Sequence, residues 1–214
     1  QTRQGVVKDG PNQAPKPDHL AILINDALWL VALVVTVYTA LALASFTMDY
    51  PAWSRSVDVL DQAHNLGGVM GAYLADIAYY LVGLSAWWLV LAAVVLLVKS
   101  FHPLSLQPAE PRQYRFLWGA AGMLLLLLAS PLLEHMLWRH DLAEALPVGA
   151  GGLWGRFLAP VFAPLLGLSG SLIVLLLLML LGISLLTQVS WLVLVEKLGM
   201  QLEWLWLKLV KRPH

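Results

Sequence analysis

The chain has 214 residues, of which 59% are hydrophobic and 12% are charged. Soluble domains carry about 25% charged residues, so this composition excludes an ordinary soluble domain and indicates a membrane protein. The formal net charge is zero and cysteine is absent, which excludes a disulfide framework, a thiolate nucleophile and a cysteine metal site.

The hydropathy predicts three regions. Residues 1–19 are polar and rich in proline, and we interpret them as a flexible cytoplasmic tail. Residues 20–195 are expected to form a membrane domain, and residues 196–214 a cytoplasmic basic amphipathic segment. Each crossing needs about 20 apolar residues. The spans are therefore placed near 27–48, 77–98, 116–133 and 168–189.

The first span has an alternative interpretation, and the start of the last span needs a further argument. Ala42-Leu43-Ala44 resembles a signal-peptide cleavage site, but the preceding apolar stretch exceeds the usual length of about 7–15 residues. The uncharged stretch 157–195 is too long for one crossing, and Pro160 and Pro164 are expected to break its start. We therefore interpret 149–166 as an interfacial or partly buried approach to the last span.

The distribution of lysine and arginine predicts the orientation. The N-terminal tail, the 99–115 loop and the C-terminal segment hold three, three and four of the 13 cations, whereas the loops 49–76 and 134–156 together hold three. Loops rich in lysine and arginine stay in the cytoplasm. Both termini are therefore expected in the cytoplasm, and the other two loops outside, which in a bacterium means the periplasm.

An internal repeat relates the two halves of the membrane domain. Residues 67–98 and 151–182 align without a gap, and Gly83-Leu84-Ser85 falls on Gly167-Leu168-Ser169. Three further glycines, Gly67, Gly68 and Gly71, fall on Gly151, Gly152 and Gly155. Chance would give about 0.2 such pairs, although shared helix composition is the alternative origin. The predicted fold is an all-α membrane protein with four transmembrane helices in two pseudo-repeated hairpins, each with a Gly-rich periplasmic approach segment.

Small residues recur with helical spacing in each approach segment. The two sets are Gly67, Gly71 and Ala75, and Gly151, Gly155 and Ala159. Residues four apart share one helix face, and small side chains there let another backbone come close. Two hypotheses remain open: the glycines form a packing surface, or they shape a turn that leads into the span.

The sequence offers no catalytic motif. No phosphate-binding loop and no H-E-x-x-H occur, so we expect no catalytic residue, no metal and no cofactor in this chain. A polar cluster follows the third span: Glu134, His135, His140, Asp141 and Glu144. Its spacing fits no standard metal motif, and we interpret it as a solvated loop, with a metal site as the alternative.

Polar residues outside that cluster suggest structural roles. We interpret His64, Asn65 and Asp76 as capping or loop-ordering groups rather than catalytic ones. The predicted spans contain no Asp, Glu, Lys, Arg or His, which counts against a transport pathway.

The end of the chain has an amphipathic pattern. One helical face holds leucines, and the cations of the segment, Lys197, Lys208, Lys211 and Arg212, are predicted to contact the anionic inner leaflet. A plain stop-transfer flank is the alternative interpretation.

Several motifs together resemble the N-terminal four-span domain of the FtsK/SpoIIIE family of bacterial DNA translocases. The matching pieces are Tyr50-Pro51-Ala52-Trp53-Ser54, Asn65-Leu66-Gly67-Gly68, Gly71-Ala72-Tyr73-Leu74-Ala75-Asp76, Leu146-Pro147, Gly149 to Gly155, and Gly182 to Trp191, which ends in Ser190-Trp191. The resemblance covers roughly residues 25–200.

The resemblance implies a function. The family joins this anchor to a linker and a hexameric ATPase that pumps duplex DNA, and no position here matches the motor motifs. It therefore implies a membrane anchor and divisome-interaction domain at the division septum of the inner membrane, without enzyme activity or nucleic-acid binding of its own, in a protein that couples septation to chromosome segregation. The implied partners are membrane lipid, other division proteins and further copies of the chain, as a hexamer. A small two-repeat transporter or channel is the alternative.

Overall fold

The computed structural model describes residues 19–49, 52–54, 65–101, 112–138, 145–189, 196, 199–204, 206 and 208. Within these ranges the chain forms five α-helices and one short 3₁₀ helix, and no β-strand. The elements are α1 (His19–Ala44), α2 (Gly68–Val82), η1 (Gly83–Ala86), α3 (Trp87–Phe101), α4 (Arg112–Leu137) and α5 (Gly152–Thr187). Four helical stretches are long and apolar enough to cross a membrane, which confirms the predicted all-α, four-span fold.

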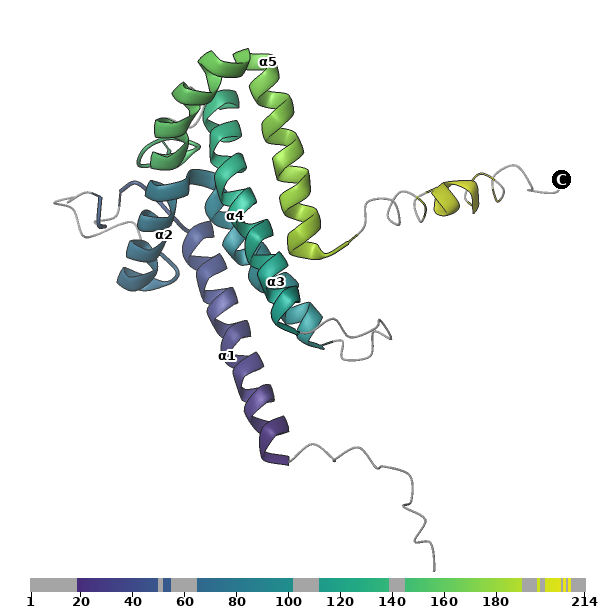
Figure 1. Cartoon of the computed structure of the whole chain (residues 1–214). Helices are drawn as coiled ribbons and strands as arrows, with labels where there is room; N and C mark the ends of the chain where they lie inside the picture. The colour runs from purple at the N-terminus through teal and green to yellow at the C-terminus, as the bar shows by residue number, and fades with distance from the viewer. Residues whose placement is uncertain are drawn as a thin grey trace, which may run out of the picture.

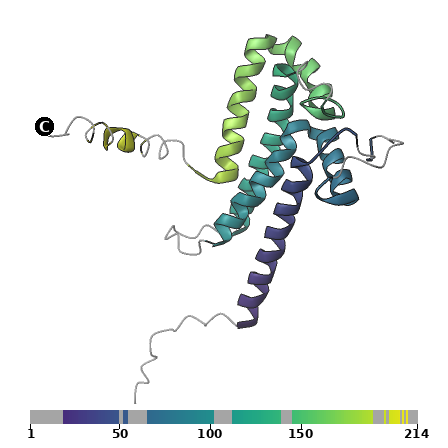
Figure 2. The ribbon, with the colours of Figure 1, turned by 180° about the vertical axis from the view of Figure 1, so that it is seen from behind.

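The helices form two hairpins that run side by side. In Figure 1, α1 and α4 run upward, while α3 and the second half of α5 run downward. We call the end where α1 and α4 stop, at Ala44 and Leu137, the loop end. The opposite end, where α3 and α5 stop, is the termini end; Figure 2 shows the same arrangement from behind.

Two hydrogen bonds join the helices near the termini end. The indole N–H of Trp29 in α1 donates to the carbonyl of Leu97 in α3, at 3.2 Å. The ammonium of Lys99 in α3 donates to the carbonyl of Leu186 in the last turn of α5, at 3.0 Å. Because the last four carbonyls of a helix lack helical partners, the Lys99 contact satisfies one such carbonyl at the end of α5.

The backbone repeats itself at the glycines that the sequence alignment pairs. Gly68 and Gly152 have φ of 64° and 59°. Gly83 has φ 62° and ψ −143°, and Gly167 has φ 67° and ψ 171°. The last two conformations are accessible essentially only to glycine, so each approach helix is separated from its span by a glycine-specific break. The pseudo-repeat is thus present in backbone conformation as well as in sequence.

The helix boundaries differ from the predicted spans at informative places. The predicted span 77–98 begins inside α2 and crosses the break at Gly83, because the apolar composition continues across that break. The prediction that Pro160 and Pro164 break the start of the last stretch is wrong. Both lie inside α5, and the non-helical residue is Gly167. Both prolines are exposed, so their rings displace no packed neighbour of the chain.

The other two boundaries also move. The first candidate span is Ile22–Ala44 rather than 27–48, and the third is Phe116–Leu137 rather than 116–133. The longer α4 takes in Glu134 and His135. Glu134 is only 8% exposed, so the interpretation of this position as part of a solvated loop is wrong.

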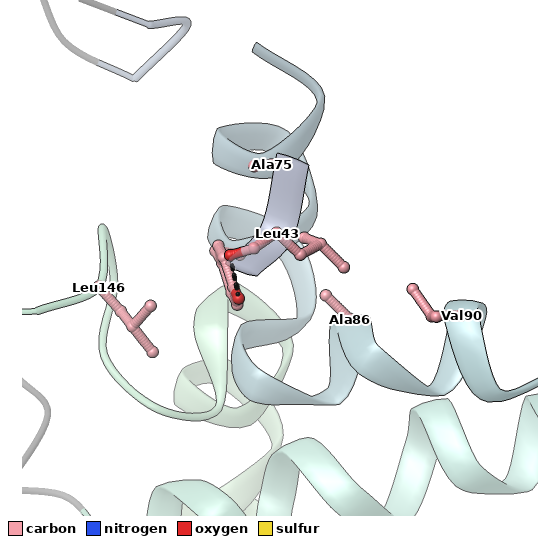
Figure 3. Close-up of a cluster of buried hydrophobic side chains, with 6 residues drawn as sticks. Leu43, Ala75, Ala86, Val90 and Leu146 are labelled. Carbon is pink, nitrogen blue, oxygen red and sulfur yellow. Dashed lines mark hydrogen bonds between the residues drawn. The ribbon is translucent and has the colours of Figure 1, made fainter. Parts of the chain in front are cut away.

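A buried apolar cluster joins the two hairpins near the loop end. It contains Leu43 of α1, Ala75 and Tyr79 of α2, Ala86 of η1, Val90 of α3 and, from the segment before α5, Leu146 (Figure 3). Leu146 lies in the loop of the second hairpin, between α4 and α5, so its burial places part of that loop in the core of the first hairpin. A second cluster holds α4 to α5 through Ala129, Leu132, Leu133 and Leu175.

A pair of glycines lets α4 and α5 cross closely. A Cβ on Gly122 would lie 2.7 Å from the carbonyl oxygen of Gly182, and a Cβ on Gly182 would lie 2.9 Å from Leu126 Cγ. Small residues at such crossings allow backbone-level packing, which replaces the hydrophobic driving force that lipid removes.

The two helix breaks allow a matched test of packing against backbone strain. Gly167→Ala places a Cβ in open space, so it should cost only the strained conformation, about 1–3 kcal/mol. Gly83→Ala has a similar strain and also drives the Cβ into the carbonyl of Ala150. Overpacking adds typically about 1–3 kcal/mol, so this variant should unfold at clearly lower temperature in detergent. Equal thermal stability of the two variants would contradict the close contact.

Candidate functional site at the loop end

Side chains of the first loop and α2 cap the end of α1. The amide of Asn65 donates to the carbonyl of Ala42 at 2.8 Å, and its oxygen accepts from the backbone N–H of Gly67 at 2.8 Å. The hydroxyl of Tyr79 donates to the carbonyl of Leu43 at 3.0 Å. These groups satisfy carbonyls in the last turn of α1, which lack helical partners. Asn65 therefore joins the end of α1 to the start of α2.

Asp76 fixes the segment that contains Trp53 and Ser54. Its carboxylate accepts from the backbone N–H of Ser54 at 2.7 Å and from the Ser54 hydroxyl at 2.8 Å. Asp76 is fully buried, whereas Trp53 remains 58% exposed and sets its ring edge against Tyr80, with the ring centroids 5.1 Å apart. The structure thus brings together three residues named by the family resemblance. These contacts hold the exposed side chain of Trp53 in a fixed position against α2.

A second carboxylate has the same kind of contact at the junction between the hairpins. Glu134 of α4 accepts from the backbone N–H of Ser85 at 3.1 Å and from its hydroxyl at 2.7 Å. The Ser130 hydroxyl also donates to Glu134, at 2.9 Å, and the indole N–H of Trp88 donates to Ser130, at 3.0 Å. A buried carboxylate needs such donors. Glu134 therefore ties η1 and α3 of the first hairpin to α4 of the second.

The small-residue faces of the two approach segments lie against the preceding spans. On α2, a Cβ on Gly71 would approach the Cβ of Ala42 to 3.3 Å, and Ala75 is fully buried. In the second hairpin, a Cβ on Gly155 would overlap the carbonyl oxygen of Pro131 in α4, and Ala159 is 4% exposed.

The remaining glycines of these segments have two roles. A Cβ on Gly67 or on Gly151 would also meet the preceding span, at the ring of Tyr38 and at the Cβ of His135. Gly68 instead has a positive φ with no neighbour within 4 Å. In the first segment, close packing and the turn conformation therefore occur at different glycines.

The two approach segments meet end to end at backbone level. The backbone N–H of Leu84 donates to the carbonyl of Ala150 at 2.8 Å. A Cβ on Gly83 would lie 2.7 Å from the backbone nitrogen of Gly152, which itself has a positive φ. We call this contact the glycine junction. It places the end of the first approach helix on the start of the second.

Several predicted site residues lie outside the described residues: Ser190, Trp191, Lys197, Lys211, Arg212, His64, His140, Asp141 and Glu144. Lys208 is described and exposed. Within the part of the chain that the structure describes, no three His, Cys, Asp or Glu side chains gather closely enough to hold a metal ion.

Sequence reasoning missed the contacts of Glu134, Ser85, Ser130 and Trp88. Glu134 and Ser85 are 49 positions apart, and neither matches a motif. One signal was available, since Ser130 and Glu134 are spaced by four and so share a helix face. At the end of an apolar stretch, however, a glutamate at a buried junction and one in a solvated loop look alike in sequence.

The Glu134 contact should contribute measurably to stability. Glu134→Leu leaves the buried N–H and hydroxyl of Ser85 without their acceptor, and each unpaired donor costs about 1–3 kcal/mol. Ser85→Ala removes only the hydroxyl and should cost about 1 kcal/mol. Denaturation of both single variants and the double variant should show coupling of about 0.5–3 kcal/mol. Strictly additive losses would mean that the two side chains do not interact.

Comparison with known proteins identifies the family. The model of the "4TM region of DNA translocase FtsK/SpoIIIE" matches residues 22–199. The chain is 46% identical over 177 residues to DNA translocase FtsK 1 of Neisseria meningitidis serogroup B, a match that covers 83% of this chain and 22% of that protein. It is 31% identical over 194 residues to DNA translocase FtsK 2 of Ralstonia nicotianae, covering 89% of this chain and 25% of that protein.

The match to DNA translocase FtsK of Shewanella oneidensis is 30% identical over 188 residues, with 86% of this chain and 20% of that protein covered. No solved structure matches the chain. The chain spans about a fifth to a quarter of the length of these relatives, and the match lies in their membrane region. With four membrane-spanning helices and a family match over 22–199, the chain belongs to the family of the four-span membrane region of the DNA translocases FtsK and SpoIIIE.

Proposed function

We propose that this chain is the membrane anchor and divisome-interaction domain of an FtsK-like DNA translocase of the inner membrane, located at the division septum. In this proposal it positions a DNA-pumping protein at the septum and so helps to couple septation to chromosome segregation. The family membership and the four spans support the anchor role. We assign neither ATP hydrolysis nor DNA binding to this segment, because the match covers the membrane region alone.

One observation favours an interaction surface at the loop end. Trp53 is 58% exposed, yet Asp76 fixes the backbone of the next residue through two short hydrogen bonds. An exposed aromatic side chain that is held rigidly loses little entropy when a partner covers it, which is how interface hot spots gain affinity. α2 extends this surface with Tyr73 and Ile77, which are 42% and 39% exposed. Other division proteins are the proposed partners, with further copies of the chain joining through its remaining exposed faces.

A transport function has less support. Ionisable side chains that line a pathway normally follow one another through the membrane. Among the described residues the buried acidic side chains are Asp76 and Glu134. Both lie near the loop end, and serine donors occupy both of them. Their contacts are those of structural groups that hold loops and helices together.

The orientation can be tested with reporter fusions. The cationic tail, middle loop and C-terminal segment should face the cytoplasm, because lysine and arginine are retained on that side. Fusions at positions 105 and 213 should therefore report the cytoplasm, and fusions at 57 and 143 the periplasm. A cytoplasmic signal at 57 or 143 would be incompatible with the proposed topology.

Septal targeting can be tested with one surface variant. In cells depleted of the full-length translocase, a fluorescent fusion of this chain should concentrate at the septum. Trp53→Ala should strongly reduce that enrichment, because truncating an aromatic hot spot costs about 2 kcal/mol or more of binding energy. The fold should persist, since the Asp76 contacts use the Ser54 backbone and hydroxyl.

Trp118→Ala is the matched control for this experiment. Trp118 is 54% exposed, but it lies in the first turns of α4 at the termini end. This variant should keep the septal signal of the unaltered chain. Uniform envelope fluorescence of the unaltered chain would contradict the divisome proposal, and equal loss in both variants would contradict the assignment of Trp53.

A further inference from the structure

The chain changes direction where α5 ends. Gln188 comes directly after the last helical residue with φ 54° and ψ 28°, a left-handed conformation that stops an α-helix. The hydroxyl of Ser184 donates to the carbonyl of Val189 at 3.2 Å, which holds the chain in this turn. Lys99 fixes the last turn of α5 to α3. The chain beyond this turn is therefore not a straight continuation of the membrane-spanning helix.

The described residues beyond this turn are helical and exposed. Of the C-terminal segment, residues 196–214, the structure describes 196, 199–204, 206 and 208, all as helix. The large apolar side chains among these described residues, Met200, Leu202, Trp204 and Trp206, are between 56% and 66% exposed. In Figure 1 this helical piece lies to the side of the bundle, beyond the lower end of α5. Nothing in the described chain covers its apolar surface.

Two pairs of residues give the C-terminal segment two faces. Leu202 and Trp206 are four residues apart and share one side of the helix. Trp204 and Lys208 are also four residues apart, and the Lys208 ammonium lies 4.6 Å from the centre of the Trp204 ring. The tryptophan thus holds the cation beside an aromatic surface. The sequence adds further cations at Lys197, Lys211 and Arg212.

We propose that the C-terminal segment is an interfacial helix that binds the headgroup layer of an anionic membrane leaflet. Tryptophan prefers the membrane interface, because its ring is apolar and its N–H stays hydrated. Lysine extends its charge toward lipid phosphate while its methylene chain stays apolar. Leu202 and Trp206 enter the acyl boundary, and the Trp204–Lys208 pair binds the phosphate layer.

The position of the segment in the chain selects lipid as its occupant. It starts shortly after the end of a helix that is long and apolar enough to span the membrane. The segment can therefore reach the headgroup layer of the membrane in which its own chain is embedded. The turn at Gln188 allows the helix to lie along that layer rather than to extend away from it as a stop-transfer flank would. The inference is independent of septal targeting and of any division partner.

The test uses the full chain in nanodiscs and an environment-sensitive label. Because the chain has no cysteine, a single introduced cysteine carries the label without further changes. Leu202→Cys places the label on the proposed lipid face, and Gln201→Cys is the matched control on the cationic face. In nanodiscs that contain phosphatidylglycerol, the label at 202 should be protected from an aqueous quencher and the label at 201 should be accessible. With phosphatidylcholine alone, protection at 202 should fall several-fold.

Charge variants complete the test. In the Leu202→Cys background, Lys208→Gln should lower the ratio of membrane-bound to unbound segment about fivefold in anionic nanodiscs. The reason is that each cation near such a surface contributes about 1 kcal/mol to binding. Lys208→Arg keeps the charge and should retain protection. An accessible label at 202 in both lipids would overturn the proposal in favour of a free flank. Equal protection in both lipids would overturn the role of anionic headgroups, and protection that appears only with two or more copies per nanodisc would assign the helix to a contact between chains.

Discussion

The glycine junction is the contact on which the arrangement of the two hairpins depends. A lipid bilayer provides no hydrophobic drive to bring apolar helices together, so their association relies on close van der Waals contact and on hydrogen bonds. At Gly83 and Gly152 both occur, because neither residue has a side chain and the N–H of Leu84 reaches the carbonyl of Ala150 at 2.8 Å. One methyl group at Gly83 would occupy the position of that carbonyl. The junction therefore fixes the first hairpin against the second at the level of the backbone.

The two serine–carboxylate contacts depend on this backbone arrangement. Ser85 lies two residues after Gly83, within η1, and donates both its N–H and its hydroxyl to Glu134. Asp76 lies on the same α2 helix whose far end is the junction, and it organises the Trp53–Ser54 segment on the outer side. Both carboxylates are buried, and burial makes each serine donor necessary. A buried polar network thus specifies one arrangement of loops in an otherwise apolar molecule.

Much of this fold can be predicted from the sequence, because apolar length and glycine position carry strong signals. They indicate the four spans and the repeat, but the predicted span 77–98 crosses Gly83 without a break, so the sequence does not predict the two breaks at Gly83 and Gly167. Hydropathy and proline position instead predict a break at Pro160 and Pro164, because proline is the usual cause of a broken helix. A glycine with positive φ and extended ψ, such as Gly167, does not change the hydropathy of its segment. The contacts of Glu134 could not be predicted. They join residues 49 positions apart, and the Gly122–Gly182 crossing likewise depends on how two helices meet in space.

The two halves of the repeat share a backbone path but differ in what that path contacts. Gly83 packs against the second hairpin, whereas a Cβ on its counterpart Gly167 would meet nothing within 4 Å. Within one chain, the end of the first approach helix packs against Ala150 and Gly152. The end of the second approach helix, at Gly167, has no such packing partner among the described residues. Leu168, directly after that second break, is 61% exposed, whereas its counterpart Leu84 is partly buried against the shared core. The repeat therefore supplies a common helix–break–span unit, and the single glycine junction makes the chain asymmetric. That asymmetry leaves the chain with one packed break, at Gly83, and one open break, at Gly167.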